Sequence, residues 1–447
     1  MKNSIITVGI FFDGTGNNGI NATASRKPQT NNESYYGNTT NIYKMFGLFD
    51  GDEKIYVEGI GTVTAQEDSD FAMATCRNPG KSQGYSSDDK LNRAFSFLEK
   101  ITADKNRSYE LYVYGFSRGA MLARHFCHEL LKPEPAIQAD ITIKFLGVFD
   151  TIESSAFSEY NLTLLPGIQR ALHLCAVNEC RYFFPLTGFF EESRELADTK
   201  YERKNAVWKE IFVPGAHADV GGGYLGGSES VYISPDFISK DDLVSYIENI
   251  RETAADRDGN SVWDHLSEHI NVEQGDVFYQ AYLERDLVYS EMSRIYGRLM
   301  LKESNFDRQV FSTDFSESDF LIDPEKHPYL AELCHASEAY AEHLYPELKP
   351  EYNYEKLMDY IHISANFGLF HAGLIYSKAG AHAEFINNGL NVPTHSDSQF
   401  STDQTKLRSE IHHVENSVVD YAYGMNTPNN DNWSRTILIK ENLYNKC

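Results

Sequence analysis

A mainly apolar segment, a serine between two glycines and a helical pattern follow one another directly in the first third of the chain. Residues 110–114 form the apolar segment, Gly115-Phe116-Ser117-Arg118-Gly119 forms the turn, and residues 119–131 repeat apolar side chains at helical spacing. A serine at such a turn has a strained backbone, and the glycines leave room for the incoming strand and the outgoing helix. This order predicts a nucleophile elbow with Ser117 as the nucleophile. A serine that only caps the helix is the structural alternative.

Further strand-like segments end at turn residues in the same way. Helical patterns at residues 88–101 and 119–131 separate some of them, and the strand-like segments lack the clean alternation of a half-exposed sheet. The sequence therefore predicts an α/β-hydrolase-like fold, a mostly parallel sheet with helices on both faces and chemistry at the carboxyl ends of the strands. The expected strands are residues 4–12, 54–57, 110–114, 141–149 and 208–213.

The character of the sequence changes near residue 225. Three later stretches are charged, rich in Tyr and Glu and helical in pattern, namely residues 236–257, 272–300 and 329–360. We predict that residues 1–225 form the first part of the core, that residues 226–360 form a helical insertion covering the site as a cap, and that residues 361–447 complete the core with a polar loop at 388–408. A separate helical domain is the alternative for the insertion.

An activated serine needs an acid and a base, and in α/β-hydrolases the chain order is serine, acid, histidine. Asp219 lies in the glycine-rich segment 214–224, just beyond an expected strand. Asp150 ends the strand that follows the nucleophile helix, and an acid one strand later fits the usual order better. Asp219 is therefore the predicted acid and Asp150 the alternative, which could instead order neighbouring loops.

The predicted base is His362, which ends a helical region and begins an apolar run. His371 and the pair His412-His413 compete with it. His217 is a further alternative, but it lies only two residues from Asp219, so that aspartate could hardly orient it and a loop-stabilising role is expected.

The oxyanion hole of such a site uses the backbone N–H of the residue after the nucleophile and a second donor from an early strand-end loop. Arg118 supplies the first. The loop Asp13-Gly14-Thr15-Gly16 supplies the second, from the amide of Gly14 or Thr15. An ordinary Asp-Gly turn is the alternative for this loop.

Composition excludes some classes of partner. The net charge is -25, with 65 acidic and 40 basic residues, so nucleic acid is not an expected partner. No export signal of the Sec type and no spanning stretch are evident, which predicts a cytoplasmic location in the producing cell and only peripheral membrane contact. The six cysteines form no paired framework and are expected to be free. His265-Leu266-Ser267-Glu268-His269 has the form of an inverted zinc motif without a third ligand, so we expect no metal and no cofactor.

Five segments together resemble a known family, the uncharacterised α/β-hydrolase domain family that includes type VI secretion lipase effectors of the Tle class. The resemblance implies that Ser117 is the nucleophile, that Asp219 is the acid and that the element around His362 supplies the base. It rests on Phe11-Phe12-Asp13-Gly14-Thr15-Gly16-Asn17-Asn18, Tyr56-Val57-Glu58-Gly59-Ile60-Gly61-Thr62, Gly115-Phe116-Ser117-Arg118-Gly119-Ala120, Gly147-Val148-Phe149-Asp150-Thr151 and residues 214–224.

The same resemblance implies a phospholipase of the A1 or A2 type that is delivered into the periplasm of a rival bacterium. Its expected partners are a phospholipid substrate, a secretion-spike protein and a cognate immunity protein in the producer. Two other functions are compatible with the residues. One is an esterase or thioesterase for small soluble esters, and the other is a catalytically inactive hydrolase scaffold used for binding.

Overall fold

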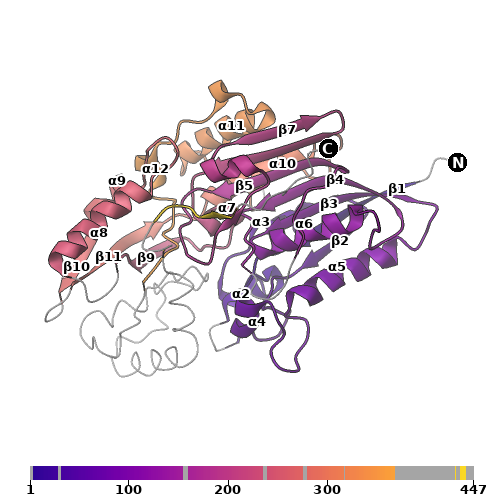
Figure 1. Cartoon of the computed structure of the whole chain (residues 1–447), viewed down its shortest axis with the longest axis horizontal. Helices are drawn as coiled ribbons and strands as arrows, with labels where there is room; N and C mark the ends of the chain where they lie inside the picture. The colour runs from indigo at the N-terminus through magenta and orange to yellow at the C-terminus, as the bar shows by residue number, and fades with distance from the viewer. Residues whose placement is uncertain are drawn as a thin grey trace.

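The structure, a computed structural model, describes residues 4–28, 32–154, 160–234, 239–274, 279–316, 318–367, 428 and 433–438. Its centre is a seven-stranded sheet that helices cover on both faces (Figure 1). Six strands run parallel, and only the edge strand β7 is antiparallel to its neighbour. This is the predicted fold class. From edge to edge the order is β2 (Glu53–Val57), β1 (Ile5–Phe12), β3 (Ser108–Phe116), β4 (Asp140–Phe149), β5 (Ile168–Ala176), β8 (Ala206–Val213) and β7 (Thr199–Arg203).

Alternate residues of the central strands serve two different cores, because successive side chains of a strand point to opposite faces. In β3, Leu111 and Val113 pack with helices α5 (Ser87–Ile101) and α6 (Arg118–Leu131). Tyr112 and Tyr114 face the other way and pack with α3 (Asn41–Leu48) and α10 (Met292–Ser304). Both faces of the sheet are therefore apolar, which is why the strand sequences show no alternation of polar and apolar residues.

The carboxyl ends of the parallel strands gather the segments that matter for chemistry. Helix α6 begins directly after β3, and the short helix α7 (His217–Gly221) follows β8. The connection from β1 to β2 also carries α1 (Gly19–Ala22) and α2 (Glu33–Tyr36), and α4 (Asp70–Thr75) follows β2. Loops at this edge can bring side chains from distant parts of the chain together.

Residues 226–360 contain more than the predicted helices. Helices α8 (Lys240–Thr253), α9 (Trp263–Leu266), α11 (Pro328–His343) and α12 (Tyr354–Leu357) accompany α10. The stretch from residue 272, predicted as helix, instead forms β10 (Ile270–Gln274) and β11 (Tyr279–Val288), which join β9 (Gly227–Tyr232) in an antiparallel sheet. Helix α10 packs on β4 and β5 of the main sheet, so part of this segment belongs to the core. A cap function for the segment stays a prediction.

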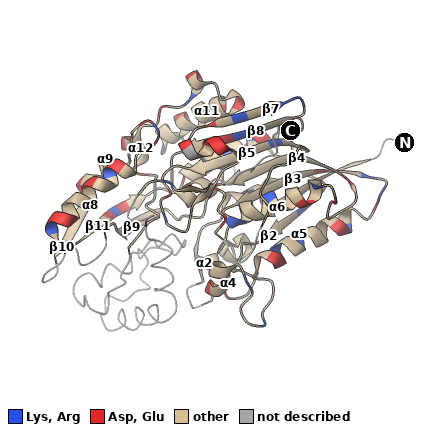
Figure 2. Ribbon diagram, viewed as in Figure 1, with Lys and Arg blue, Asp and Glu red and all other residues tan. Residues whose placement is uncertain are grey.

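Helix α8 carries both acidic and basic residues, whereas α11 carries acidic residues and neither Lys nor Arg (Figure 2). Among the described residues, no helix has both the length and the apolar character needed to span a bilayer.

Near the C-terminus the described strand β12 (Ile437–Leu438) pairs in parallel with β6 (Leu186–Thr187). The five cysteines of the described ranges are free and buried, Cys175 and Cys180 among them. The histidines 371, 412 and 413, the polar loop 388–408 and Cys447 lie outside the described residues.

Candidate active site

Ser117 lies between β3 and α6 with φ 58° and ψ −129°, a conformation that L-residues rarely adopt. The two glycines of the motif have the expected steric role. A Cβ on Gly115 would lie 2.5 Å from Cα of Ala120, and one on Gly119 would lie 2.3 Å from the carbonyl oxygen of Asp13. The elbow geometry expected at this motif is thus present, with the strand, the turn and the helix in the predicted order.

Asp150 lies beside Ser117 because β3 and β4 end at the same level. Phe116 pairs with Phe149, and the backbone N–H of Ser117 donates to the carbonyl of Phe149 at 3.1 Å. Asp150 follows immediately with a positive φ of 40°, and its own N–H donates to Leu174 at 2.8 Å on the next strand. The register of the sheet therefore places the alternative acid next to the predicted nucleophile.

The carboxylate of Asp150 is completely buried and accepts three hydrogen bonds. Oδ2 lies 2.6 Å from Nδ1 of His217, and Oδ1 accepts the backbone N–H of Ala176 and Nη2 of Arg435, each at 2.9 Å. Burial alone would raise the pKa of Asp150, but the charge of Arg435 and the hydrogen bond from His217 outweigh it and hold the pKa below its usual value. Asp150 is therefore an ionised partner for an imidazole.

His217 is the first residue of α7, and its ring lies against the ring of Phe116 with centroids 4.5 Å apart. Burial is the main influence on its pKa and lowers it, while the hydrogen bond and the charge of Asp150 oppose this effect. The imidazole is thus neutral near pH 7, with Nδ1–H donated to Asp150 and Nε2 available as a base. Asp219, expected to be a poor partner for His217, pairs with His362 instead, and the carboxylate that contacts His217 is that of Asp150.

The first-ranked acid and base also form a pair. Asp219 Oδ1 lies 2.6 Å from Nδ1 of His362, and Asp219 Oδ2 accepts the backbone N–H groups of His362 and Ala216, each at 2.9 Å. The ring of His362 stacks on Tyr224 at a centroid distance of 4.2 Å. The structure therefore brings each predicted acid together with one predicted base. Each of the two Asp–His pairs has one member, His217 or Asp219, in α7.

The two pairs differ in how their outer ring nitrogens are placed. Nε2 of His362 is buried and has no hydrogen-bond partner among the described residues. Within the described ranges, neither Nε2 of His217 nor Oγ of Ser117 is a buried atom without a partner, and no hydrogen bond joins Ser117 Oγ to either imidazole. All three side chains belong to buried residues, and among these atoms the buried nitrogen without a partner in the described part of the chain is Nε2 of His362.

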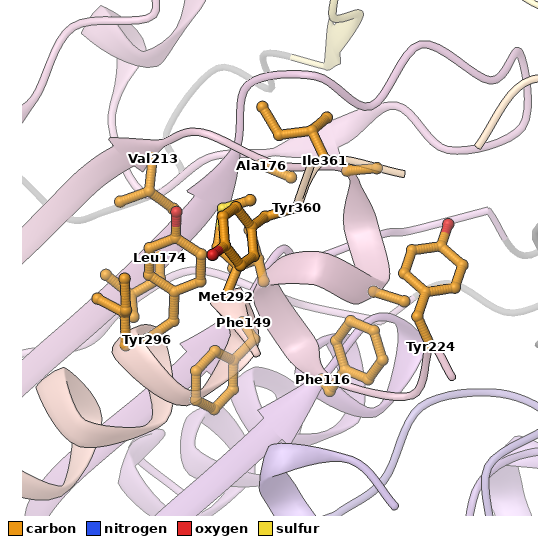
Figure 3. Close-up of a cluster of buried hydrophobic side chains, with 14 of the residues drawn as sticks. Phe116, Phe149, Leu174, Ala176, Val213, Tyr224, Met292, Tyr296, Tyr360 and Ile361 are labelled. Carbon is orange, nitrogen blue, oxygen red and sulfur yellow. The ribbon is translucent and has the colours of Figure 1, made fainter. Parts of the chain in front are cut away.

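Aromatic and aliphatic side chains pack in a buried cluster near the carboxyl ends of the strands (Figure 3). Phe116, Phe149, Leu174 and Val213 come from β3, β4, β5 and β8, and all belong to one buried cluster. Tyr296 of α10 packs with them and donates from its hydroxyl to the carbonyl of Pro214 at 2.5 Å. This packing fixes the relative positions of the strand ends from which the polar groups project.

The predicted oxyanion donors differ in whether their amides already donate a hydrogen bond within the protein. The N–H of Gly14 donates to Oδ1 of Asp13 at 2.8 Å, so that amide is occupied. No hydrogen bond from the amide of Thr15 or Arg118 occurs among the described residues, and Arg118 begins α6, where helix N–H groups lack intrahelical partners. The amides of Arg118 and Thr15 are the better candidates for the hole.

Asp13 holds this loop in place. Its buried carboxylate accepts the hydroxyls of Tyr56 at 2.6 Å and Thr40 at 2.7 Å, besides the amide of Gly14. Burial raises the pKa of Asp13 to about 6, although these hydrogen bonds lower it in part. A Cβ on Gly59 would lie 1.7 Å from the carbonyl oxygen of Gly14, so the loop packs closely against the backbone after β2.

Glu179 and Arg435 also belong to this site and are not among the residues predicted from the sequence. Glu179 accepts the amide of His217 at 3.3 Å and the hydroxyl of Ser364 at 3.0 Å, and it pairs with Arg181 at 2.9 Å. Burial would raise the pKa of Glu179, but the charge of Arg181 outweighs it and lowers the pKa to about 2. Polar residues directly after β5 were the only signal for Glu179, and the sequence around Arg435 carried none.

One cluster of potential metal ligands occurs among the described residues, formed by His173, Cys175 and Glu210. Nδ1 of His173 lies 2.7 Å from Glu210, and Nε2 accepts the backbone N–H of Thr151 at 3.0 Å. Both ring nitrogens are therefore engaged and no lone pair is left for a metal ion. The cluster is a hydrogen-bond network that anchors the residue after Asp150.

Comparison with known proteins places this geometry in a family. The family model described as "T6SS, Phospholipase effector Tle1-like, catalytic domain" matches residues 7–133 and 129–238, just over half of the chain. The chain belongs to this family. The matched segments contain Ser117, Asp150, His217 and Asp219, and they end well before His362.

A solved structure with the same fold is entitled "Structure of the Tle1 effector bound to the VgrG spike from the Type 6 secretion system". It is 19% identical, with a TM-score of 0.56 over 82% of this chain and 85% of that chain. An uncharacterized protein from Pseudomonas aeruginosa is 15% identical with a TM-score of 0.41, over 98% of this chain and 65% of the other. No curated protein matches the chain.

Proposed function

We propose that this chain is a serine phospholipase that a type VI secretion system delivers as an antibacterial effector. The family's name indicates a phospholipase effector, and the residues at the carboxyl edge of the sheet support acyl-ester hydrolysis. The observation that carries the proposal is the position of Ser117, at a strained elbow directly beside the hydrogen-bonded pair of Asp150 and His217. An inactive scaffold has no need of the backbone strain at Ser117.

Of the two Asp–His pairs, we propose that Asp150 and His217 serve Ser117. Three observations support this choice. Asp150 follows the residue whose carbonyl accepts the amide of Ser117, the ring of His217 packs on Phe116, and both residues lie within the segments that the family model matches. The sequence-ranked pair, Asp219 and His362, is the second candidate, and His362 lies beyond the segments that the family model matches.

The proposed reaction has two halves. Oγ of Ser117 forms a bond to the ester carbonyl carbon while Nε2 of His217 takes the hydroxyl proton, and the amides of Arg118 and Thr15 donate to the oxyanion. The C–O ester bond then breaks, and His217 returns the proton to the departing alcohol. Water attacks the acyl-enzyme in the same way, with His217 again as the base, and a fatty acid leaves. Asp150 holds the ring and stabilises the imidazolium that forms in each half.

The membrane phospholipids of a target cell are the proposed substrate, reached by peripheral contact. The solved Tle1 effector was bound to a VgrG spike, so a spike protein is the proposed delivery partner of this chain. We further propose that the periplasm of the target cell is the site of action and that an immunity protein protects the producing cell.

Fatty-acid release from phosphatidylethanolamine and phosphatidylglycerol vesicles tests the reaction. Wild type should release fatty acid, whereas Ser117→Ala and His217→Ala should lose roughly three to four orders of magnitude in kcat. His362→Ala is the matched control, because its pair is equally buried, and it should retain far more activity. A loss confined to His362→Ala would transfer the base to that residue.

Lipids with different acyl chains at the two glycerol positions distinguish A1 from A2 cleavage by the fatty acid that appears first. A short-chain soluble ester tests the alternative esterase or thioesterase function. Turnover of the short ester without vesicle hydrolysis would favour that alternative, and no turnover of either substrate would favour a binding scaffold.

A further inference from the structure

Arg435 reaches the centre of the site from the opposite end of the chain. Its Nη2 donates to Oδ1 of Asp150 at 2.9 Å across 285 positions of sequence, and both side chains are completely shielded from solvent. The other carboxylate oxygen of Asp150 holds His217. Arg435 and His217 therefore use different oxygens of the carboxylate, and no hydrogen bond among the described residues joins Arg435 to Ser117 or His217.

The backbone near Arg435 is tied to the strand end that carries Asp150. The carbonyl of Thr436 accepts the amide of Leu186 at 2.8 Å, and β12 continues in parallel with β6. The amide of Thr187 in turn donates to the carbonyl of Thr151 at 2.9 Å. This short ladder connects the C-terminal strand to the residue that follows Asp150, so the guanidinium has a defined position relative to the carboxylate.

The energetics of this arginine do not favour a purely structural role. Nε and Nη1 of Arg435 are buried and have no hydrogen-bond partner in the part of the chain that the structure describes. Each such orphaned donor costs stability, and a well-packed apolar side chain at this place would avoid the cost. A buried guanidinium that satisfies only part of its hydrogen-bonding capacity, and uses that part on one carboxylate, indicates that its charge serves Asp150.

We propose that Arg435 is a positioning residue of the hydrolase, which keeps Asp150 ionised and fixes its orientation toward His217. The inference rests on the proposed role of the Asp150–His217 pair. It makes the segment that includes β12 part of the active site, because this segment supplies the guanidinium that binds the carboxylate of Asp150. The direction of the pKa of Asp150, held below its usual value against complete burial, agrees with this role.

Other charged and titratable groups also face the pair, and they stay in place when Arg435 is changed. They are Glu179 and Arg181 from the segment after β5, and His173 and Cys175 from β5.

Removing the positive charge of Arg435 should raise the pKa of both Asp150 and His217, because a cation near either group favours its less protonated form. The acidic limb of the activity profile should therefore move to higher pH.

The first test measures how fast a fluorophosphonate probe labels Ser117 between pH 4 and 8. Labelling forms a bond from Oγ to phosphorus, expels fluoride and requires deprotonation by the base, so it reports on the site whatever the natural ester is. We expect Arg435→Gln to label about ten- to hundredfold more slowly at neutral pH, with its acidic limb displaced upward. Arg435→Lys should restore the position of the limb.

Ile437→Ala is the matched control. It weakens the packing of the same strand in the small buried cluster around Cys175 and Phe212, and it removes no charge. This variant should unfold at a lower temperature while its pH profile stays that of wild type. The inference is overturned if Arg435→Gln behaves like Ile437→Ala, with lowered stability and an unmoved limb.

The outcomes for the proposed function and for Arg435 can be told apart. Rapid labelling of His217→Ala would remove the proposed base and the basis for the role of Arg435. If His217→Ala is labelled slowly, as proposed, but the pH profile of labelling of Arg435→Gln is identical to that of wild type, only the role of Arg435 is overturned. kcat measured with a short-chain ester should fall in Arg435→Gln more than KM rises, since Arg435 does not contact substrate.

Discussion

The imidazole of His217 packs against the phenyl ring of Phe116 at a centroid distance of 4.5 Å and an interplanar angle of 32°. Phe116 is the last residue of β3 and Ser117 is the next residue. The proposed base is thus held beside the proposed nucleophile by contact with the strand that leads into Ser117. On its other side the ring is fixed by Asp150, which extends from the neighbouring strand.

The first prediction concerns the pH dependence of turnover. His217 must be neutral to accept a proton, and burial lowers its pKa from the ordinary value of 6.5. Activity should therefore persist below pH 6.5 and decline only as the solution pH falls through this lowered pKa. The profile of kcat/KM between pH 4 and 8 checks this. An acidic limb centred above pH 6.5 would contradict the assignment of His217 as the base.

The second prediction compares two inactive variants of the nucleophile. Ser117 has φ 58° and ψ −129°, which glycine adopts without strain and alanine does not. Ser117→Gly should therefore be more stable than Ser117→Ala by about 1 kcal/mol, and neither should hydrolyse esters. Urea unfolding of the two proteins measures the difference. Equal stabilities would mean that the elbow carries no backbone strain.

Much of the fold follows from the sequence because its strands are buried on both faces. The five predicted strands occur as β1, β2, β3, β4 and β8, and the two predicted helices next to them occur as α5 and α6. Strand β5 was missed, since Arg170 and His173 interrupt its apolar run. His173 is fully buried there only because Glu210 and the amide of Thr151 satisfy its ring, and these partners are distant in sequence.

The site could be predicted only in part. The local motif predicts Ser117 as the nucleophile, because strand, turn and helix are consecutive in sequence, and the Asp13 loop is predicted separately because it ends an early strand-like segment. The pairing of acids with bases depends instead on strand order, and the sequence did not reveal that β4 lies next to β3 while α7 reaches across from β8. For this reason His217 was compared with Asp219, its neighbour in sequence, and not with Asp150, its neighbour in space. The distant Arg435 could not be foreseen at all.

The third prediction concerns Asp13. Its pKa is raised from 3.8 to about 6 in the folded protein, so the native state binds a proton more tightly than the unfolded chain. Wild type should consequently lose about 3 kcal/mol of stability, relative to Asp13→Asn, as pH rises from about 4 to about 6. Urea unfolding of both proteins at several pH values measures this difference. A difference that does not change across that window would show that Asp13 ionises normally.

The fourth prediction concerns the buried pair of Glu179 and Arg181. Glu179→Gln leaves the guanidinium without its carboxylate and should lower the free energy of unfolding at pH 7 by about 3–5 kcal/mol. Because the pKa of Glu179 is depressed from 4.5 to about 2, its contribution is present above pH 4.5 and is lost as pH falls toward 2. The gap between wild type and Glu179→Gln should therefore narrow between pH 4.5 and 2. Adding Arg181→Met should recover much of the loss at pH 7, and a double variant no more stable than Glu179→Gln would show that the ion pair is not the cause.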